Sequence, residues 1–200
     1  MNKLTELEIK RINFINIHTK KMGLGDKIQE LISDNGVVGT AVNAVNATKI
    51  LTLDTQPTIG DTMTIGTKVY TFVASGTATT VGKISIGTDL PTAKIAIIAA
   101  INGTDTVNAP HPLVSASAFV ANVCTLTALL GGVAGNLVAL TETFTAATNV
   151  FASVTLTGGI DGTVGTVGKT MIDNTYLYVS VADNTVSDKN WRRIAIGVTF

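Results

Sequence analysis

The spacing of hydrophobic and polar positions changes near Asn35-Gly36. Before this point apolar residues recur every three or four positions, which predicts two amphipathic helices separated by Gly23 and Gly25. Arg11 interrupts the apolar stripe of the first helix. The stripe is the candidate attachment or oligomer interface, and it consists of Leu4, Leu7, Phe14, Ile17, Leu24, Ile28 and Leu31.

This N-terminal segment has two interpretations. In the first it is an anchoring or oligomerisation element that docks into a partner or a sister chain. In the second it is an ordinary helical hairpin that folds onto its own domain. A heptad coiled coil is not indicated, because three or four sustained repeats are missing.

After Gly36 the apolar residues alternate with a period of two, and Thr, Val, Ala and Gly dominate. Runs of this kind predict β-strands. The predicted strands cover residues 49–53, 63–65, 69–73, 83–86, 123–127, 154–157, 176–181 and 193–196. Gly66-Thr67 predicts a hairpin turn with Gly in the first position.

A single helix is predicted among the strands, from Leu90 to Ile101, with Asp89 as N-cap and Asn102-Gly103 as its end. Together the elements predict an α+β fold. It consists of an N-terminal helical segment (1–35), a β-rich module with one helix packed on a sheet (36–160), and a glycine-rich linker with a short C-terminal β unit (161–200). The last part is too small to be stable unless it packs on a neighbour.

The charge balance narrows the classes of partner. The chain has 14 Lys plus Arg and 14 Asp plus Glu, so its net charge is zero. This balance predicts neither a nucleic-acid partner nor an anionic membrane surface. Charged residues are only 14% of the chain, against about 25% in typical soluble proteins. A surface so poor in charge is expected to be covered by copies of the same chain or by other partners.

Candidate chemistry is sparse. The one cysteine, Cys124, lies in an apolar run and is predicted to be a small buried hydrophobic residue. His18 and His111 have no neighbouring carboxylate in the sequence. The longest apolar run, residues 95–101, is shorter than the ~20 residues of a membrane-spanning helix. The charged first 20 residues do not resemble a secretory signal, so a soluble protein made in the cytosol is expected.

Two glycine-containing stretches suggest phosphate binding and are rejected. Gly168-Lys169-Thr170 ends like a phosphate-binding loop, but the required Gly at position 163 is Thr, and a strand is predicted to follow. Residues 131–136 (GGVAGN) resemble half of a dinucleotide fingerprint without the helix that should follow, so a turn between strands is expected.

The remaining polar residues favour structural roles. Four aspartates, Asp161, Asp173, Asp183 and Asp188, lie in turn-like contexts without calcium-loop spacing. Trp191, Arg192 and Arg193 form a cationic and aromatic cluster that could bind a nucleic acid or a glycan, although capping a core is the favoured interpretation. We therefore expect no enzyme, no catalytic residue, no cofactor and no metal site.

Several phrases, taken in order, resemble virion proteins of tailed bacteriophages. Residues 59–73 (IGDTMTIGTKVYTFV) resemble the opening phrase GDTVTIGGKTYTF, and 191–195 (WRRIA), after an insertion at 186–190, resemble the end of YLYVCTADNTWKRVAL. The intervening matches are 83–87 (KISIG), 98–102 (IAAIN), 125–136 (TLTALLGGVAGN), 155–163 (TLTGGIDGT) and 174–185 (NTYLYVSVADNT).

The resemblance implies a non-enzymatic structural component of a phage virion, assembled in the host cytoplasm. A head fibre or capsid decoration protein is the leading hypothesis, attached through its N-terminal helices. The expected partners are sister chains, with a trimer favoured, and other virion proteins such as capsid or connector subunits. The alternatives are a tail-associated protein (sheath, tube or fibre element) and a glycan-binding module that stacks sugars on Tyr176, Tyr178 and Trp191.

Overall fold

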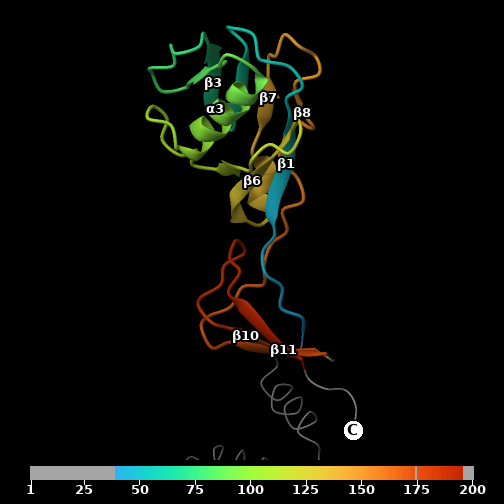
Figure 1. The fold of residues 1–200 in the computed structure, drawn as a ribbon. Coiled ribbons are helices and arrows are strands. Elements are labelled where there is room, and N and C mark those ends of the chain that lie inside the picture. The colour runs from blue at the N-terminus through green and yellow to red at the C-terminus, as the bar shows by residue number, and fades with distance from the viewer. Residues whose placement is uncertain (1–38, 174, 196–200) are drawn as a thin grey trace, which may run out of the picture. The chain divides into compact units, whose positions relative to one another are not determined.

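The computed structural model describes residues 39–173 and 175–195, which fall into two compact units (Figure 1). Unit 2 runs from Ala44 to Gly162 and also includes Val186–Asp188. Unit 1 contains residues 39–43, Thr163–Thr185 and the residues that follow from Lys189. Unit 2 is therefore inserted into unit 1 along the chain. The seven N-terminal interface residues predicted above lie outside the described residues.

Unit 2 contains two four-stranded sheets. The first has the order β5-β6-β1-β8, formed by Val114–Ala116, Val123–Gly131, Asn46–Thr52 and Val150–Phe151. The second has the order β4-β3-β2-β7, formed by Lys83–Ser85, Lys68–Val73, Thr62–Ile65 and Leu140–Glu142. Every pair is antiparallel except β3 with β4, which is parallel.

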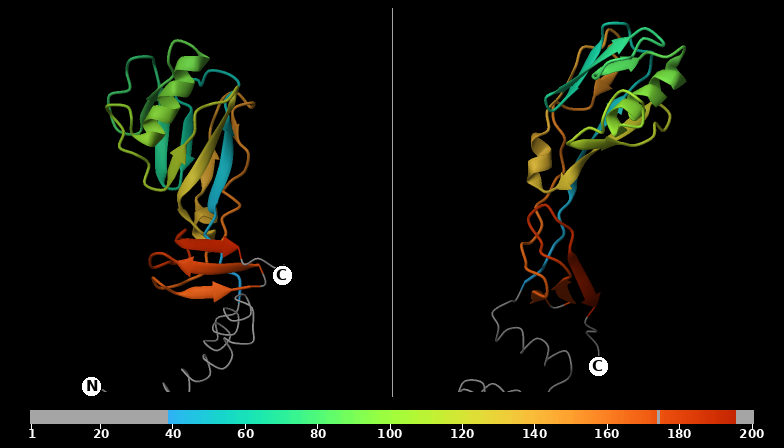
Figure 2. Two further views of the ribbon diagram at one scale, coloured as in Figure 1. Left: turned by 60° about the horizontal axis from the view of Figure 1, so that its bottom comes forward. Right: turned by 90° about the vertical axis from the view of Figure 1, so that its left-hand side faces the viewer.

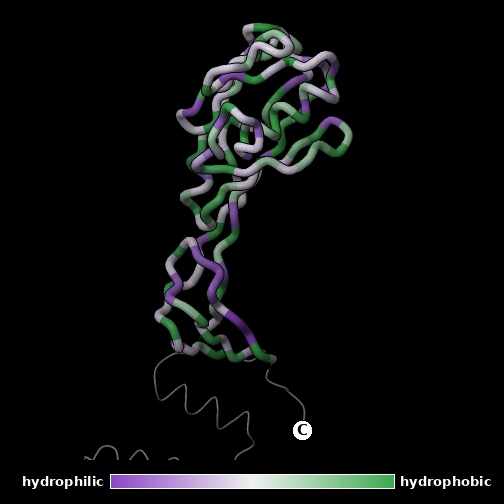
Figure 3. The backbone as a smooth tube through the Cα atoms, turned by 60° about the vertical axis from the view of Figure 1, so that its left-hand side comes forward, coloured by the Kyte–Doolittle hydropathy of each residue, from purple (hydrophilic) through white to green (hydrophobic). Residues whose placement is uncertain are grey.

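Alternation along the strands builds the core of unit 2. Leu51 of β1 pairs with Cys124 of β6, and both side chains are fully buried, whereas the next positions along each strand face outward. Tyr70 and Phe72 bring the second sheet into the same core. Figure 3 colours the backbone by hydropathy, and green or pale colours cover most of the trace.

The helix α3, Leu90–Asn102, packs against β4 and β5, the edge strands of the two sheets (Figure 2). Its buried side chains Ile97, Ala100 and Ile101 join the core of unit 2. Asp89 accepts a hydrogen bond from the Thr92 backbone in a capping box, and Gly103 ends the helix at φ +66°. The predicted helix and both of its caps are therefore confirmed.

Side-chain amides take the place of a neighbouring strand at several positions in unit 2. Asn102, at the end of α3, donates Nδ2–H to the Ala116 carbonyl (2.8 Å) and accepts the Ala116 N–H (2.9 Å). Asn136 makes the same reciprocal pair with Gly159, at 3.0 and 2.8 Å. Each amide satisfies both backbone groups of one residue, so that residue needs no strand beside it.

Unit 1 is built on a three-stranded antiparallel sheet of order β11-β10-β9, formed by Trp191–Ala195, Tyr176–Ser180 and Thr170–Ile172. Ala41, Tyr178 and Trp191 form its buried cluster, and Met171 and Tyr176 pack against this cluster. Residues 39–43, which precede unit 2 in the sequence, thus complete the small core of the C-terminal strands.

The predicted α+β class is wrong. The described residues are mostly β, with eleven strands in three sheets, and α3 is the only α-helix among them. The physical reason is that α3 contacts only two strands, β4 and β5, whereas strand pairing in three sheets builds the rest of the described fold. The predicted N-terminal helical segment lies outside the described residues and does not contribute to this class. Residues 154–157, predicted as a strand, form only isolated bridges, whereas the other predicted strands are present.

Candidate functional site

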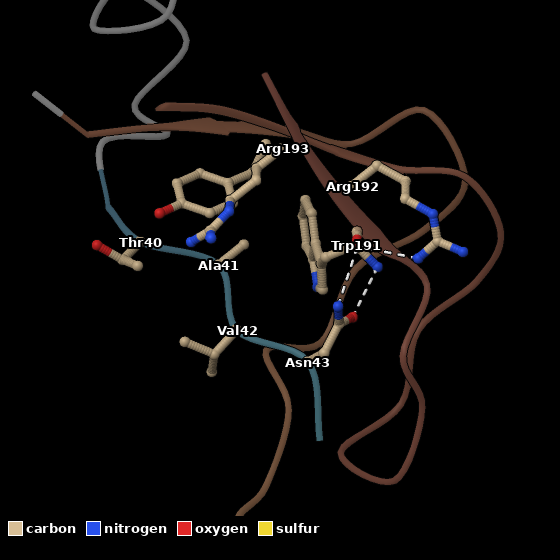
Figure 4. A pocket seen from close by; sticks show the side chains of 8 residues that line it. Thr40, Ala41, Val42, Asn43, Trp191, Arg192 and Arg193 are labelled. Atoms are coloured by element: carbon tan, nitrogen blue, oxygen red, sulfur yellow. Dashed lines mark hydrogen bonds between the residues drawn. The ribbon is translucent and has the colours of Figure 1, made fainter. Parts of the chain in front are cut away.

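A solvent-open cavity of about 570 Å³ lies in unit 1, between the segment that precedes unit 2 and the strands β10 and β11 (Figure 4). Its size falls within the range of small-molecule sites in proteins. It brings together parts of the chain that are about 150 residues apart. The lining residues are Thr40, Ala41, Val42, Asn43, Tyr178, Trp191, Arg192 and Arg193.

Trp191 forms the inner wall of this cavity. Its indole is only 3% exposed, and its Nε1–H donates to the Thr163 carbonyl at 2.6 Å. Gly165 packs against the ring so closely that a Cβ there would lie 2.6 Å from Cζ2 of the indole. The interpretation of Trp191 as a residue that caps a core is therefore confirmed.

Asn43 holds the start of β11 in place. Its Nδ2–H donates to the Trp191 carbonyl and its Oδ1 accepts the Trp191 N–H, both at 3.0 Å (Figure 4). This is the arrangement that Asn102 and Asn136 make in unit 2. It closes part of the outer edge of β11 without a further strand.

The carboxylate of Asp173, between β9 and β10, accepts several hydrogen bonds. Asp173 accepts hydrogen bonds from the Tyr178 hydroxyl (2.7 Å), the Thr40 hydroxyl (3.0 Å), and the backbone N–H groups of Thr175 (2.7 Å) and Tyr176 (2.8 Å). The bond from Tyr178 and the backbone bonds stabilise the anion and lower the pKa of Asp173 from 3.8 to about 2. Burial and the neighbouring Asp173 raise the pKa of Tyr178. Neither group titrates near neutral pH, so the pair positions Thr40 and does not transfer protons.

Arg192 and Arg193 give the cavity a cationic rim, but their guanidinium groups do not face one common site. Arg193 lies over the ring of Tyr176, 4.5 Å from the centroid. Arg192 donates through Nη1 to the carbonyls of Lys189 (3.0 Å) and Trp191 (3.3 Å). Figure 4 shows the two guanidinium groups on opposite sides of Trp191. Alternation along β11 separates them, so they do not converge on a single anion.

The three aromatic residues of the glycan hypothesis do not share an open face. Trp191 and Tyr178 are buried, at 3% and 5% exposure, and Tyr176 is half-buried under Arg193. Stacking on a sugar needs an exposed ring face, which the buried pair does not offer. This arrangement gives the glycan hypothesis no support.

No family model matches this chain, and no curated protein or solved structure matches it significantly. The site must therefore be interpreted from its own geometry.

The other sequence candidates have structural positions. Gly168 lies in a turn at φ +80°, and the following residues lead into β9 instead of a helix, which agrees with rejecting a phosphate loop. Val133–Leu137, within the glycine-rich stretch, is a short 3-10 helix (η1), where a simple turn was expected. Asp161 accepts the Val133 N–H at 2.8 Å and supports this turn.

Cys124 and His111 are both buried in unit 2. Cys124 is fully buried, as predicted, and burial raises its pKa. His111 is 2% exposed; its Nδ1 accepts the N–H groups of Leu113 (3.1 Å) and Val114 (3.3 Å). Its Nε2 therefore carries the proton and donates to the Ile65 carbonyl at 3.1 Å. Both residues therefore have structural roles in the interior of unit 2.

The described part of the chain shows neither a metal-binding cluster nor a membrane-spanning helix. Residues 39–173 and 175–195 contain no cluster of three or more His, Cys, Asp or Glu side chains that could bind a metal ion. Within the same ranges no helix is both long and apolar enough to cross a membrane. No sequence pattern marks the amide roles of Asn43, Asn102 and Asn136, because Asn is common in turns and at helix ends in general.

Proposed function

We propose that this chain is a non-enzymatic structural component of a bacteriophage virion, a head fibre or capsid decoration protein. Residues 1–35 attach it to the particle, where it works as a homo-oligomer beside capsid or connector subunits. A tail-associated position is the alternative.

The observation that carries the proposal is the agreement between the phage-like phrases and the folded elements. Residues 59–73 form the β2–β3 hairpin, 83–87 contain β4, and 98–102 end α3. The phrase at 155–163 ends one residue after Gly162, the end of the long segment of unit 2. The last two phrases supply β10 and β11 of unit 1. Several phrases that recur in order in virion proteins thus contain or end folded elements, whereas residues 125–136 begin inside β6 and end inside η1.

The surface chemistry supports the same proposal. Many large aliphatic side chains of the described residues are exposed, among them Leu137 at 82%, Val154 at 75% and Leu130 at 69%. Exposed apolar side chains combined with few charges favour a chain that works in contact with other subunits.

The connection of the chain supports an anchor at the N-terminus. Gly39, the first described residue, donates its N–H to the Ile172 carbonyl at 2.7 Å and so joins β9 of unit 1. An anchor formed by residues 1–35 would therefore connect directly to unit 1, and unit 2 would connect to it only through unit 1 along the chain.

The test is to label phage particles that carry this gene with an antibody raised against the purified chain, and to view them by electron microscopy. Label on the heads is expected. Label on the tails would support the tail alternative, and unlabelled particles together with no band on an immunoblot would overturn the proposal.

A second experiment tests the anchor. Purified full-length chain and chain lacking residues 1–34 are each added to particles that lack the protein. We expect only the full-length chain to sediment with the particles. Trp191 fluorescence, unchanged in the shorter chain, would show that unit 1 is still folded; binding of the shorter chain would contradict the anchor.

A further inference from the structure

Three side chains from separate elements of unit 2 meet at one position. Lys94 lies in α3, Asn122 immediately precedes β6, and Asp54 lies two residues after β1. Lys94 Nζ donates to Asn122 Oδ1 at 2.7 Å, and Asn122 Nδ2 donates to Asp54 Oδ1 at 2.6 Å. The Asn122 amide therefore has an amine at its oxygen and a carboxylate at its nitrogen.

Lys94 and Asn122 are both held in this position. The Asn122 carbonyl accepts the Leu53 N–H at 2.8 Å, which fixes the backbone beside the end of β1. Lys94 Nζ also donates to the Ala121 carbonyl at 2.8 Å and lies 5.4 Å from the centroid of the Phe119 ring. Both side chains are half-buried. Two groups that are already placed together lose little further freedom when they react.

The turn that presents Asn122 has an unusual backbone. Val120 and Val123 exchange both of their backbone hydrogen bonds across Ala121 and Asn122. Ala121 has φ +52°, and among the residues that the structure describes it alone combines a side chain with a positive φ. Glycine would adopt this conformation at lower cost. Strained residues of this kind cluster at functional sites.

The distance between the amine and the amide is short enough for a reaction. Nζ lies at most about 4 Å from Cγ of Asn122, because Nζ is 2.7 Å from Oδ1 and a C=O bond is about 1.2 Å long. Reacting atoms are about 3–3.5 Å apart in a near-attack geometry. Other lysines of the described residues have different acceptors: Lys49 donates to a hydroxyl, and Lys68 and Lys169 donate to backbone carbonyls.

We propose that Lys94 and Asn122 form an intramolecular isopeptide bond, with Asp54 as the proton carrier. The Lys94 ammonium first loses one proton to solvent, and the neutral Nζ attacks Cγ of Asn122. One of the two remaining Nζ protons passes through the Asp54 carboxylate to Nδ2. The Cγ–Nδ2 bond then breaks and ammonia leaves, while the new Nζ–Cγ amide remains and Asp54 is again a carboxylate. The reaction consumes no oxidant and no cofactor.

The surroundings of the amide suit these steps. The carboxylate touches the nitrogen that leaves, which is where a proton is needed. Asp54 is exposed, so ammonia is released directly into water. The bond would tie α3 to the start of β6. It lies within unit 2 and is independent of the virion proposal, since it forms in the purified chain without particles.

The first experiment is the intact mass of the purified full-length chain, measured in denaturant when fresh and after prolonged incubation. We expect a mass lower than the sequence mass by one ammonia molecule. Lys94→Arg keeps a cation at Asn122 Oδ1 but cannot form this bond, so it should keep its full sequence mass. Lys83→Arg is the matched control in the same unit and should lose ammonia like the unchanged chain.

A second experiment locates the bond. A protease that cleaves before Asp separates residues 89–104, which contain Lys94, from residues 105–160, which contain Asn122. We expect these two peptides to remain joined in the unchanged chain and to separate in Lys94→Arg. This readout distinguishes the bond from a succinimide at another Asn, which also releases ammonia but joins no peptides.

Asp54→Asn tests the proton carrier and should leave most of the chain at its full sequence mass. Reaction of this variant as fast as the unchanged chain would contradict the role of Asp54. An unchanged chain that keeps its full sequence mass after incubation would overturn the proposal. A loss of ammonia that persists in Lys94→Arg, with the two peptides separate, would overturn it as well.

Discussion

The side chain of Asn43 and the backbone of Trp191 are joined by two reciprocal hydrogen bonds, each 3.0 Å long. Asn43 precedes unit 2 in the sequence and Trp191 lies in the last segment of unit 1, so these bonds join the first and last segments of unit 1. Trp191 is also the one tryptophan of the chain. Its fluorescence therefore reports on unit 1 alone.

Asn43→Ala is expected to destabilise unit 1 by about 1–3 kcal/mol, because it leaves buried backbone groups of Trp191 without partners. Denaturant unfolding followed by Trp191 fluorescence measures the change. Asn122→Ala is the matched control, since Asn122 lies in unit 2 and bonds to Asp54 and Lys94. An equal shift in the Trp191 transition for both variants would contradict the role of Asn43.

Asp173 should make the stability of unit 1 depend on acid pH. Its pKa in the folded chain, about 2, is below its ordinary value of 3.8. The ionised carboxylate therefore stabilises unit 1 fully above pH 4, and this contribution declines as the pH falls toward 2. Acid titration of Trp191 fluorescence tests this. In Asp173→Asn the same transition should be shallower, and an unchanged profile would refute the assignment.

His111 should make unit 2 less stable in mild acid. Burial lowers its pKa below 6.5, and the nearby Lys68 lowers it further. Below about pH 6.5 the unfolded chain binds the proton more readily than the folded one, so the free energy of unfolding falls with decreasing pH. Opening of unit 2 is followed by the rate at which the buried Cys124 thiol reacts with a thiol reagent. Each rate is divided by the fraction of thiolate present at that pH. His111→Gln should lose most of this dependence; the same pH slope in the variant would count against it.

Comparing substitutions at Gly103 and Gly76 separates the cost of overpacking from the cost of backbone strain, because both glycines have a similar positive φ. A Cβ at Gly103 (φ +66°) would lie 2.2 Å from the Pro110 nitrogen, whereas a Cβ at Gly76 (φ +75°) meets nothing within 4 Å. Gly76→Ala should cost about 1 kcal/mol from backbone strain alone, and Gly103→Ala about 3 kcal/mol or more because overpacking is added. Thermal unfolding of the two variants compares these costs, and equal melting temperatures would contradict the argument.

Most strands of unit 2 could be predicted from the sequence because each has one buried face. Leu51, Cys124 and Leu126 mark that face by alternation alone, and Asp89 and Gly103 mark the ends of α3 by local capping. The predicted α+β class was wrong because it treated α3 as a layer packed on a sheet. Whether a helix forms a layer or covers an edge depends on tertiary packing, which periodicity does not contain.

The candidate site could be predicted only in part. The burial of Trp191 could be predicted, because a single Trp beside two arginines in a chain of balanced charge more often caps a core than binds a ligand. The contribution of Ala41 and Asn43 could not be found, because a contact over about 150 positions leaves no local pattern. The residue type of Asn43 does not reveal its role either, because that role depends on the edge of β11 to which its amide bonds.

The insertion of unit 2 has a consequence for how such chains change over evolution. The chain leaves unit 1 after Asn43 and returns at Thr163, and the Thr163 N–H donates to the Val42 carbonyl at 2.9 Å. Within unit 2, Val45 pairs with Ile160. The points where the chain first leaves unit 1 and then returns to it therefore lie side by side, so the long segment of unit 2, Ala44–Gly162, has the geometry of an exchangeable cassette. A replacement segment would also have to fit Val186–Asp188, the short later segment that belongs to unit 2.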